Sequence, residues 1–206
     1  MPEHRSPLTS AYWREAAAAL RKPRLLAVAA LFLALCVAIS SFFIPLVNNL
    51  RVYFTFVPKA LCAAVCGPVA ALVFGLADDL LGVMIHPSGA FFFGYTVSAM
   101  LGMVIYALGL FRRKITILRL ALTKLAVNLL VNVGLGALWS SMIYGKAYLF
   151  YAGSSLVKNL ILWPAEVILL AVFFRLLGPT MERAKLIPRQ EWAHLRRREK
   201  KSGGDL

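Results

Sequence analysis

Long apolar stretches alternate with short polar or basic segments along most of the chain. A helix needs about twenty apolar residues to cross a hydrocarbon core of about 30 Å. Several stretches approach or exceed that length, and one between them is much shorter. The pattern therefore predicts six helices, which cover residues 25–45, 58–66, 68–85, 94–111, 115–141 and 154–177.

The second predicted helix is too short to cross a bilayer. Gly67 and Pro68 end it after residues 58–66, which reach only about 14 Å. Residues 52–57, just before it, are β-branched or aromatic, which favours an extended segment. Irregular backbone at membrane depth is tolerated only where protein covers it or a cavity is present. We therefore expect the loop of residues 48–57 to dip inward and cover a pocket.

Basic residues are concentrated outside the predicted spans. The sequence holds 23 Lys and Arg against 9 Asp and Glu, a net charge of +14, although 60% of its residues are hydrophobic. Five of the basic residues lie in residues 1–24, four in residues 112–119 and nine in residues 175–201. This distribution follows the positive-inside rule, so both termini are predicted to face the cytoplasm and the pocket to open outward. Because the charge lies at the ends and in one short loop, nucleic acid is not an expected partner.

Together these features predict an all-α membrane protein with one six-helix transmembrane domain. We expect a basic cytoplasmic segment at residues 1–24, the transmembrane domain at residues 25–180 and a basic cytoplasmic tail at residues 181–206. The tail is either solvated or bound to anionic lipid.

Few polar side chains interrupt the predicted spans. On the third helix, Asp79 follows Gly67, Ala71 and Gly75 at four-residue intervals, and small residues at this spacing let membrane helices pack closely. A carboxylate on that face points into the bundle, where an ionisable group is a functional candidate. Asp78 lies about 100° around the helix. We therefore choose Asp79 as the candidate and treat Asp78 as secondary.

Three ionisable residues from three helices share one predicted depth. Asp79, Lys124 and Glu166 each lie about 14–17 Å from the cytoplasmic side. Asn128 and Asn132 follow Lys124 at four-residue intervals. One interpretation is that Lys124 neutralises Asp79 or Glu166 and only joins the helices. The other, which we favour, is that such a pair forms the floor of a ligand cavity with the two Asn residues in its walls.

Aromatic residues of the outer loops are further candidates for the walls of this cavity. They are Tyr53, Phe54, Phe56, Phe91, Phe92 and Phe93. They serve either as pocket walls or as an aromatic belt at the membrane interface. Arg51 and Lys59, at the predicted outer mouth, are either solvated or hold an anionic ligand.

The first predicted helix carries a stripe of small residues. Ala30, Ala34 and Ala38 repeat at four-residue intervals. Small side chains permit close helix approach, so the stripe either packs inside the bundle or docks another membrane protein.

The sequence lacks the motifs of common enzymes. The patterns G-x-S-x-G, H-E-x-x-H and C-x-x-C are absent, and so is a P-loop for ATP. Cys36, Cys62 and Cys66 lie in apolar segments, which indicates small core residues rather than a metal site. We therefore expect no enzymatic activity, no bound metal and no cofactor.

Many of these features also occur in a definite order over about residues 25–177. They are Arg51 to Pro58, Gly67-Pro68 with Gly75, Ala77 to Gly82, Pro87 to Gly89, Gly94 to Thr96, Lys124 with Asn128 and Asn132, Tyr144 to Lys146, Lys158-Asn159, and Pro164 to Glu166. The ordered set resembles the substrate-binding (S) subunits of energy-coupling factor (ECF) vitamin transporters, and within them the folate type. Phe93 departs from the family's loop, where Pro is expected.

The resemblance implies a six-helix bundle with a short second helix and a binding loop between the first two helices. It implies that the chain binds one vitamin from outside a prokaryotic plasma membrane with high affinity. It also implies partners, a transmembrane coupling subunit and two ATPases, with which the S subunit topples to release its cargo inside. The family's A-x-x-x-A docking motif maps onto Ala30 and Ala34, with Ala38 extending it, and this favours the docking interpretation.

For a folate ligand, the resemblance gives the candidate residues roles. A carboxylate, of Asp79 or Glu166, accepts hydrogen bonds from adjacent donors of the pterin ring. Asn128 and Asn132 match the remaining donors and acceptors, and loop aromatics stack on the central ring. The glutamate carboxylates are then left for the basic residues of the outer mouth, Arg51 or Lys59.

Two alternatives stay open. An ECF S subunit for another vitamin would share the fold and differ in the pocket. A small proton-coupled carrier would need Asp79, Lys124 and Glu166 to titrate during transport, but no pair of matching sequence halves is evident.

Overall fold

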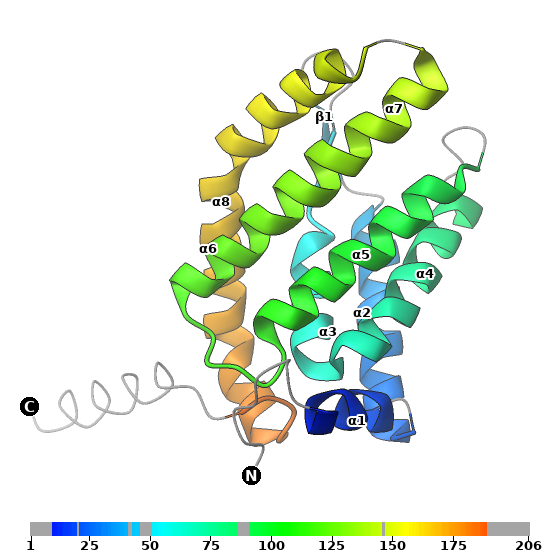
Figure 1. Ribbon diagram of the computed structural model, residues 1–206. Coiled ribbons are helices and arrows are strands. Elements are labelled where there is room, and N and C mark those ends of the chain that lie inside the picture. Colours follow the sequence, from blue (N-terminus) through cyan, green and yellow to red (C-terminus); the bar gives the residue numbers. More distant parts are fainter. Residues whose placement is uncertain are drawn as a thin grey trace, which may run out of the picture.

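The apolar stretches of the sequence form helices that lie side by side in a bundle (Figure 1). The computed structural model describes residues 10–19, 21–40, 43–45, 51–85, 91–145 and 147–188. In chain order the elements are α1 (Ser10–Ala19), α2 (Pro23–Ser40), β1 (Phe43–Pro45), β2 (Arg51–Tyr53), α3 (Phe56–Cys66), α4 (Pro68–Ile85), α5 (Phe93–Leu110), α6 (Ile117–Ala126), η2 (Val127–Leu135), α7 (Gly136–Tyr144) and α8 (Tyr148–Arg183).

Five helical stretches of the described chain are long and apolar enough to cross a membrane. They are Pro23–Ser40, Pro68–Ile85, Phe93–Leu110, Ile117–Tyr144 and Tyr148–Arg183. The fourth is continuous through α6, η2 and α7. The eleven-residue helix α3 is shorter and almost entirely buried among the others. The chain is therefore a multi-pass membrane protein, and the predicted six-helix bundle with a short second helix is confirmed.

The connection before α3 differs from the prediction. α2 ends at Ser40, not at residue 45, and residues 43–45 form β1, which pairs with β2 in a small antiparallel ribbon. The predicted extended segment is extended only as far as Tyr53. A turn follows, and α3 begins at Phe56, two residues before the Pro58 start that the sequence indicated.

The last helix is longer at both ends than predicted. α8 has 36 residues and continues through Gly178 and Pro179, where the sequence predicted its end. It also contains Pro164. Proline is tolerated in membrane helices because neighbouring groups satisfy the freed backbone carbonyls. α8 begins at Tyr148, six residues before the start that the sequence predicted.

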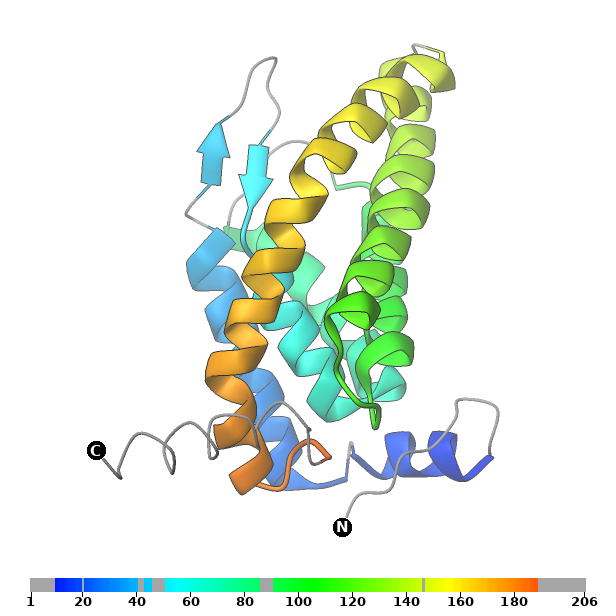
Figure 2. The same ribbon diagram turned by 90° about the vertical axis from the view of Figure 1, so that its left-hand side faces the viewer.

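The N-terminal segment, for which the sequence predicted no helix, contains α1. Figures 1 and 2 show α1 lying across one end of the bundle, roughly perpendicular to the long helices. Its Ala16 is fully buried and clusters with Phe111, and Val69 and Leu108 pack against the two. The start of α2 and the end of α8 lie at this same end, where Arg24 Nη2 donates a 3.0 Å hydrogen bond to the Ala184 carbonyl.

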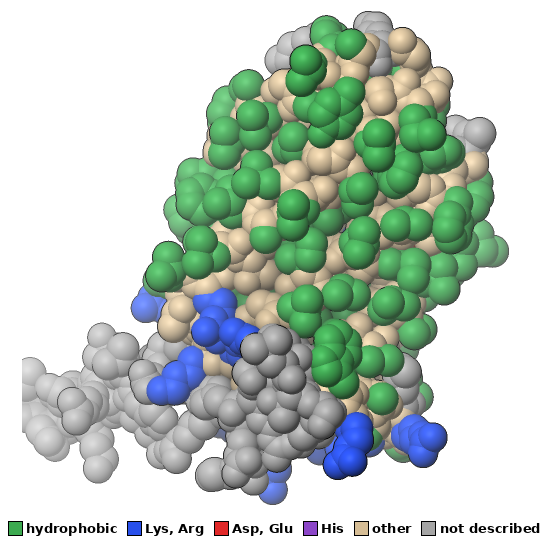
Figure 3. Space-filling model, viewed as in Figure 1, with side chains coloured by type: hydrophobic (Ala, Val, Ile, Leu, Met, Phe, Trp, Pro, Cys, Tyr) green, Lys and Arg blue, Asp and Glu red, His purple; other side chains and the backbone are tan. Residues whose placement is uncertain are grey.

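Basic side chains gather at the end of the bundle that α1 covers. On the face shown in Figure 3, Lys and Arg lie at that end, and hydrophobic side chains cover the rest of the described surface. Such a surface suits a bundle that is surrounded by lipid along its length and meets charged headgroups at one end.

α4 and α5 pack closely through the small residues predicted for this purpose. A Cβ atom on Gly75 would lie 2.8 Å from both the Ala99 carbonyl oxygen and Met100 Cα, so only glycine fits there. Gly67, with φ of 81°, separates α3 from α4 in a backbone conformation that favours glycine.

Candidate functional site

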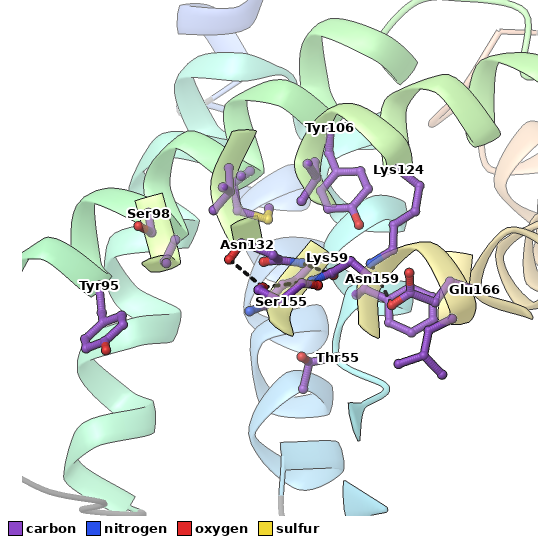
Figure 4. Close-up of a pocket in the computed structure, with 18 of the residues that line it drawn as sticks. Thr55, Lys59, Tyr95, Ser98, Tyr106, Lys124, Asn132, Ser155, Asn159 and Glu166 are labelled. Atoms are coloured by element: carbon purple, nitrogen blue, oxygen red, sulfur yellow. Dashed lines mark hydrogen bonds and ion pairs between the residues drawn. The ribbon is translucent and has the colours of Figure 1, made fainter. Parts of the chain in front are cut away.

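A cavity of about 390 Å³ lies between α3, α5, α8 and the continuous helix formed by α6, η2 and α7 (Figure 4). Its size falls within the range of small-molecule sites. The residues that line it are Thr55, Phe56, Lys59, Tyr95, Ser98, Ala99, Gly102, Met103, Tyr106, Lys124, Val127, Val131, Asn132, Gly136, Ser155, Lys158, Asn159, Leu162 and Glu166.

A buried polar network joins two walls of the cavity. Lys124 Nζ lies 3.0 Å from Glu166 Oε1, and the two side chains are only 4% and 13% exposed. Asn128 Nδ2 donates to Glu166 Oε2 at 2.9 Å. Asn132 Nδ2 donates to Asn128 Oδ1 at 3.0 Å and to Asn159 Oδ1 at 3.2 Å. Because both carboxylate oxygens already have partners, the buried charge of Glu166 is compensated before any ligand binds.

The middle of the fourth span is a π-helix, and this determines which of its residues face the cavity. η2 widens the helix between Val127 and Leu135. Residues four and five positions apart then share a face more nearly than in an α-helix, so Val127, Val131, Asn132 and Gly136 all line the cavity. Short π-helical segments inside α-helices occur frequently at functional sites.

The cavity contains more positive than negative side-chain charge. Lys59 pairs with Asp78 at 2.8 Å, and Lys124 pairs with Glu166. Lys158 also lines the cavity and is partly buried, but no carboxylate of the described residues lies within 4.0 Å of it. Of the three lysines in the lining, Lys158 is therefore the one without an ion pair among the described residues.

The structure separates Asp79 from the other two ionisable candidates. Thr96 Oγ1 donates to Asp79 Oδ2 at 2.6 Å, so this carboxylate joins α4 to α5. Asp79 is not in the cavity lining, whereas Lys124 and Glu166 meet there. Asp78, which the sequence made secondary, is the aspartate that contacts the cavity lining, because it pairs with Lys59.

The aromatic candidates lie in three different surroundings. Phe56 lines the cavity, with Lys124 Nζ 4.4 Å from its ring centroid, an arrangement that adds a cation–π contact. Phe54 is partly buried and packs against the core. Phe92 forms edge contacts with Tyr95 and Trp139, with ring centroids 5.9 and 5.6 Å apart. Of Arg51 and Tyr53 the structure describes only the backbone in β2, and their side chains lie outside the described part.

The sequence analysis missed the contribution of α5. Tyr95, Ser98, Gly102 and Tyr106 line the cavity at intervals of three and four residues, which is one face of a helix. The available signal was that Tyr95, Ser98 and Tyr106 carry hydroxyl groups on one face of an apolar span. This signal is weak, because single hydroxyls in a membrane helix commonly hydrogen-bond to neighbouring helices, as Ser98 does by accepting from Trp139 Nε1 at 2.9 Å.

The alanine stripe lies on the outer surface of α2. Ala30, Ala34 and Ala38 are all exposed, so they do not pack inside this bundle. Cys36 on the same helix, by contrast, is buried in the core, as predicted.

The chain is similar to two curated folate transporters. It is 35% identical over 121 residues to the folate transporter FolT of Clostridium novyi (strain NT), an alignment that covers 59% of this chain and 70% of that protein. It is 34% identical over 126 residues to FolT of Leuconostoc mesenteroides subsp. mesenteroides, with 58% and 68% covered. The chain belongs to the FolT family. No family model matches it.

A solved FolT structure agrees with the FolT assignment. The structure of FolT bound with folic acid superposes with a TM-score of 0.65 at 29% sequence identity and covers 71% of this chain and 89% of the other. The family assignment made from the sequence is therefore confirmed. The FolT relatives are named as transporters and not as enzymes.

Proposed function

We propose that this chain is the folate-binding S subunit of an ECF-type ABC transporter, which captures the vitamin outside the cell and delivers it inward. The observation that carries the proposal is the cavity with its buried Lys124–Glu166 network, found in a member of the FolT family. The FolT structure with folic acid supports folate as the ligand. The basic residues at the α1 end favour a cytoplasmic position for both termini.

The polarity of the cavity suits a ligand with a heteroaromatic head and an anionic tail. Glu166 and the adjacent Asn side chains supply acceptors and donors for a pterin ring at the inner end of the cavity. Lys158 lies eight residues before Glu166 on α8, about 12 Å nearer the outer end. Its uncompensated charge is placed to meet the glutamate carboxylates, a role that the sequence offered to Arg51 or Lys59.

The partners in this proposal are a transmembrane coupling subunit and two ATPases. The chain has no P-loop, so ATP-driven uptake requires another protein. The exposure of Ala30, Ala34 and Ala38 on α2 supports a contact in the membrane at this stripe, because small side chains allow close helix approach.

The direct test is folate binding by the purified chain without nucleotide or partner. Titration calorimetry in detergent should give saturable binding with one folate per chain. Mass spectrometry of ligand retained through purification tests the competing proposal of a different vitamin, which a retained vitamin other than folate would favour. Failure to bind folate, in a sample that shows a cooperative thermal transition, would refute the proposal.

The partner contact is tested by Ala34→Leu. We expect this variant to bind folate normally, because Ala34 faces away from the cavity, and to lose most ATP-dependent uptake in membranes that contain the coupling subunit and ATPases. The control is Ala165→Leu, which adds the same bulk at an exposed position of α8. Equal uptake by both variants would exclude the alanine stripe as the contact. Uptake by the isolated chain, driven by a proton gradient, would favour the alternative of a small proton-coupled carrier.

A further inference from the structure

The hydroxyl of Tyr106 is the exception in a site whose other buried polar groups are paired. Tyr106 is only 3% exposed, and within the described part of the chain its Oη atom has no hydrogen-bond partner. Buried hydroxyls nearly always have a partner, so such a group calls for an explanation. Because Tyr106 lines the cavity, the missing partner can come from what the cavity binds.

Tyr106 lies at the inner end of the cavity. Along α5 the lining runs from the half-exposed Tyr95 to the buried Tyr106, eleven residues or about 16 Å deeper. Figure 4 shows the Tyr106 hydroxyl pointing toward the level at which Lys124 and Glu166 meet. The orphan hydroxyl and the buried ion pair therefore face the same part of the cavity.

Tyr106 supplies a donor there that no acceptor of the described residues uses. Lys124 forms an ion pair with Glu166, and Asn128 donates a hydrogen bond to it. Asn132 donates to Asn128 and Asn159. A pterin ring carries donors, which a carboxylate accepts, and also acceptors, namely a carbonyl oxygen and ring nitrogens, which need a donor.

We propose that the Tyr106 hydroxyl donates a hydrogen bond to an acceptor atom on the fused ring of the bound ligand and so helps to select the ring. The inference rests on the proposed folate-binding function. It adds a residue that the sequence analysis did not choose, and it fixes which end of the ligand lies deepest.

The test is Tyr106→Phe, which removes a single oxygen atom. Without ligand, the thermal midpoint of the variant should equal or exceed that of the wild type, because a buried polar group without a partner is lost. Folate affinity should fall about tenfold, the effect of one hydrogen bond to a buried group. The matched control is Tyr148→Phe, the same change at an exposed tyrosine at the start of α8 that does not line the cavity, for which we expect less than a twofold change.

Pteroic acid, which has the pterin and the central ring but no glutamate, tests which end of the ligand is contacted. Tyr106→Phe should weaken pteroic acid and folate by the same factor. A loss for folate alone would place the hydroxyl at the glutamate and overturn the inference. Unchanged folate binding with a lowered thermal midpoint would also overturn it, because the hydroxyl would then serve the fold through a buried water. In either case folate binding by the wild type would leave the proposed function intact.

Discussion

Two carboxylates with a similar predicted depth in the membrane, Asp79 and Glu166, have different surroundings. Asp79 on α4 accepts a hydrogen bond from the hydroxyl of Thr96 on α5, and Thr96 is fully buried. One turn away on α4, Gly75 lies so close to α5 that no side chain would fit there. Glu166 is held by Lys124 and Asn128 at the edge of a cavity. The first lies in packed protein, and the second has space beside it.

The comparison shows that depth and residue type do not by themselves identify a binding group. Both carboxylates are partly buried, and each accepts a hydrogen bond from a neighbouring helix. What differs is the partner: a neutral hydroxyl in a helix interface for Asp79, and a cation plus an amide at the wall of a cavity for Glu166. We therefore propose that Asp79 serves packing and Glu166 the ligand, and variants at the two sites should separate stability from binding.

The largest effect is expected at the cavity, from Lys124→Met. The change leaves Glu166 buried without its cation, which should cost about 3–5 kcal/mol of stability. Folate affinity should fall about a hundredfold or more, since truncating one member of a buried pair typically costs a site 2–5 kcal/mol. Thermal melts and calorimetry measure the two quantities separately.

The control for this variant is the double change Lys124→Met with Glu166→Gln. It removes both charges, so the thermal midpoint should recover most of its loss while folate binding stays weak. Recovery of binding together with stability would mean that the ion pair only joins helices, and the contrast between the two carboxylates would disappear.

An intermediate effect is expected from Lys158→Gln at the outer part of the cavity. This partly exposed cation has no ion pair among the described residues, so its loss should leave the fold intact and weaken folate binding about fivefold. The deficit should shrink in high salt, because exposed charges are screened. Lys114→Gln, an exposed site of equal charge change in the loop between α5 and α6, is the control and should bind like the wild type.

Folate with both glutamate carboxylates converted to amides sharpens this measurement. The wild type and Lys158→Gln should bind the diamide equally. If the variant loses affinity for the diamide as it does for folate, Lys158 acts on the shape of the cavity and not on the ligand's charge.

Much of the bundle could be predicted from the sequence because its signals are local. α4 has the predicted bounds, since Gly67-Pro68 breaks the chain before it. Helix ends without such a signal were less accurate. Nothing local distinguishes a proline that ends a helix from Pro179 in α8, where the surrounding protein decides.

The candidate site was predictable only in part, because it depends on how the helices are rotated. The four-residue spacing of Lys124, Asn128 and Asn132 indicated a polar stripe, and the Lys124–Glu166 pair was one of two pairings considered. The choice between Asp79 and Glu166 depended on which face of α4 meets α5, and no single-helix pattern contains that information. The same holds for Tyr106, whose importance lies in the absence of a partner.

The smallest effect is expected from Asp79→Asn, and it bears most directly on the comparison. Asparagine keeps an oxygen that can accept from Thr96, so the contact between α4 and α5 persists, and folate affinity should stay within twofold of the wild type.

Thr96→Val is the companion variant. It removes the donor and leaves the partly buried carboxylate without it, which should cost about 1–3 kcal/mol of stability and again leave folate binding nearly unchanged. A tenfold loss of folate affinity in Asp79→Asn with an unchanged thermal midpoint would contradict the assignment. Asp79 would then be a ligand-binding group, and the face of α4 predicted from the sequence would have to turn toward the cavity when folate binds.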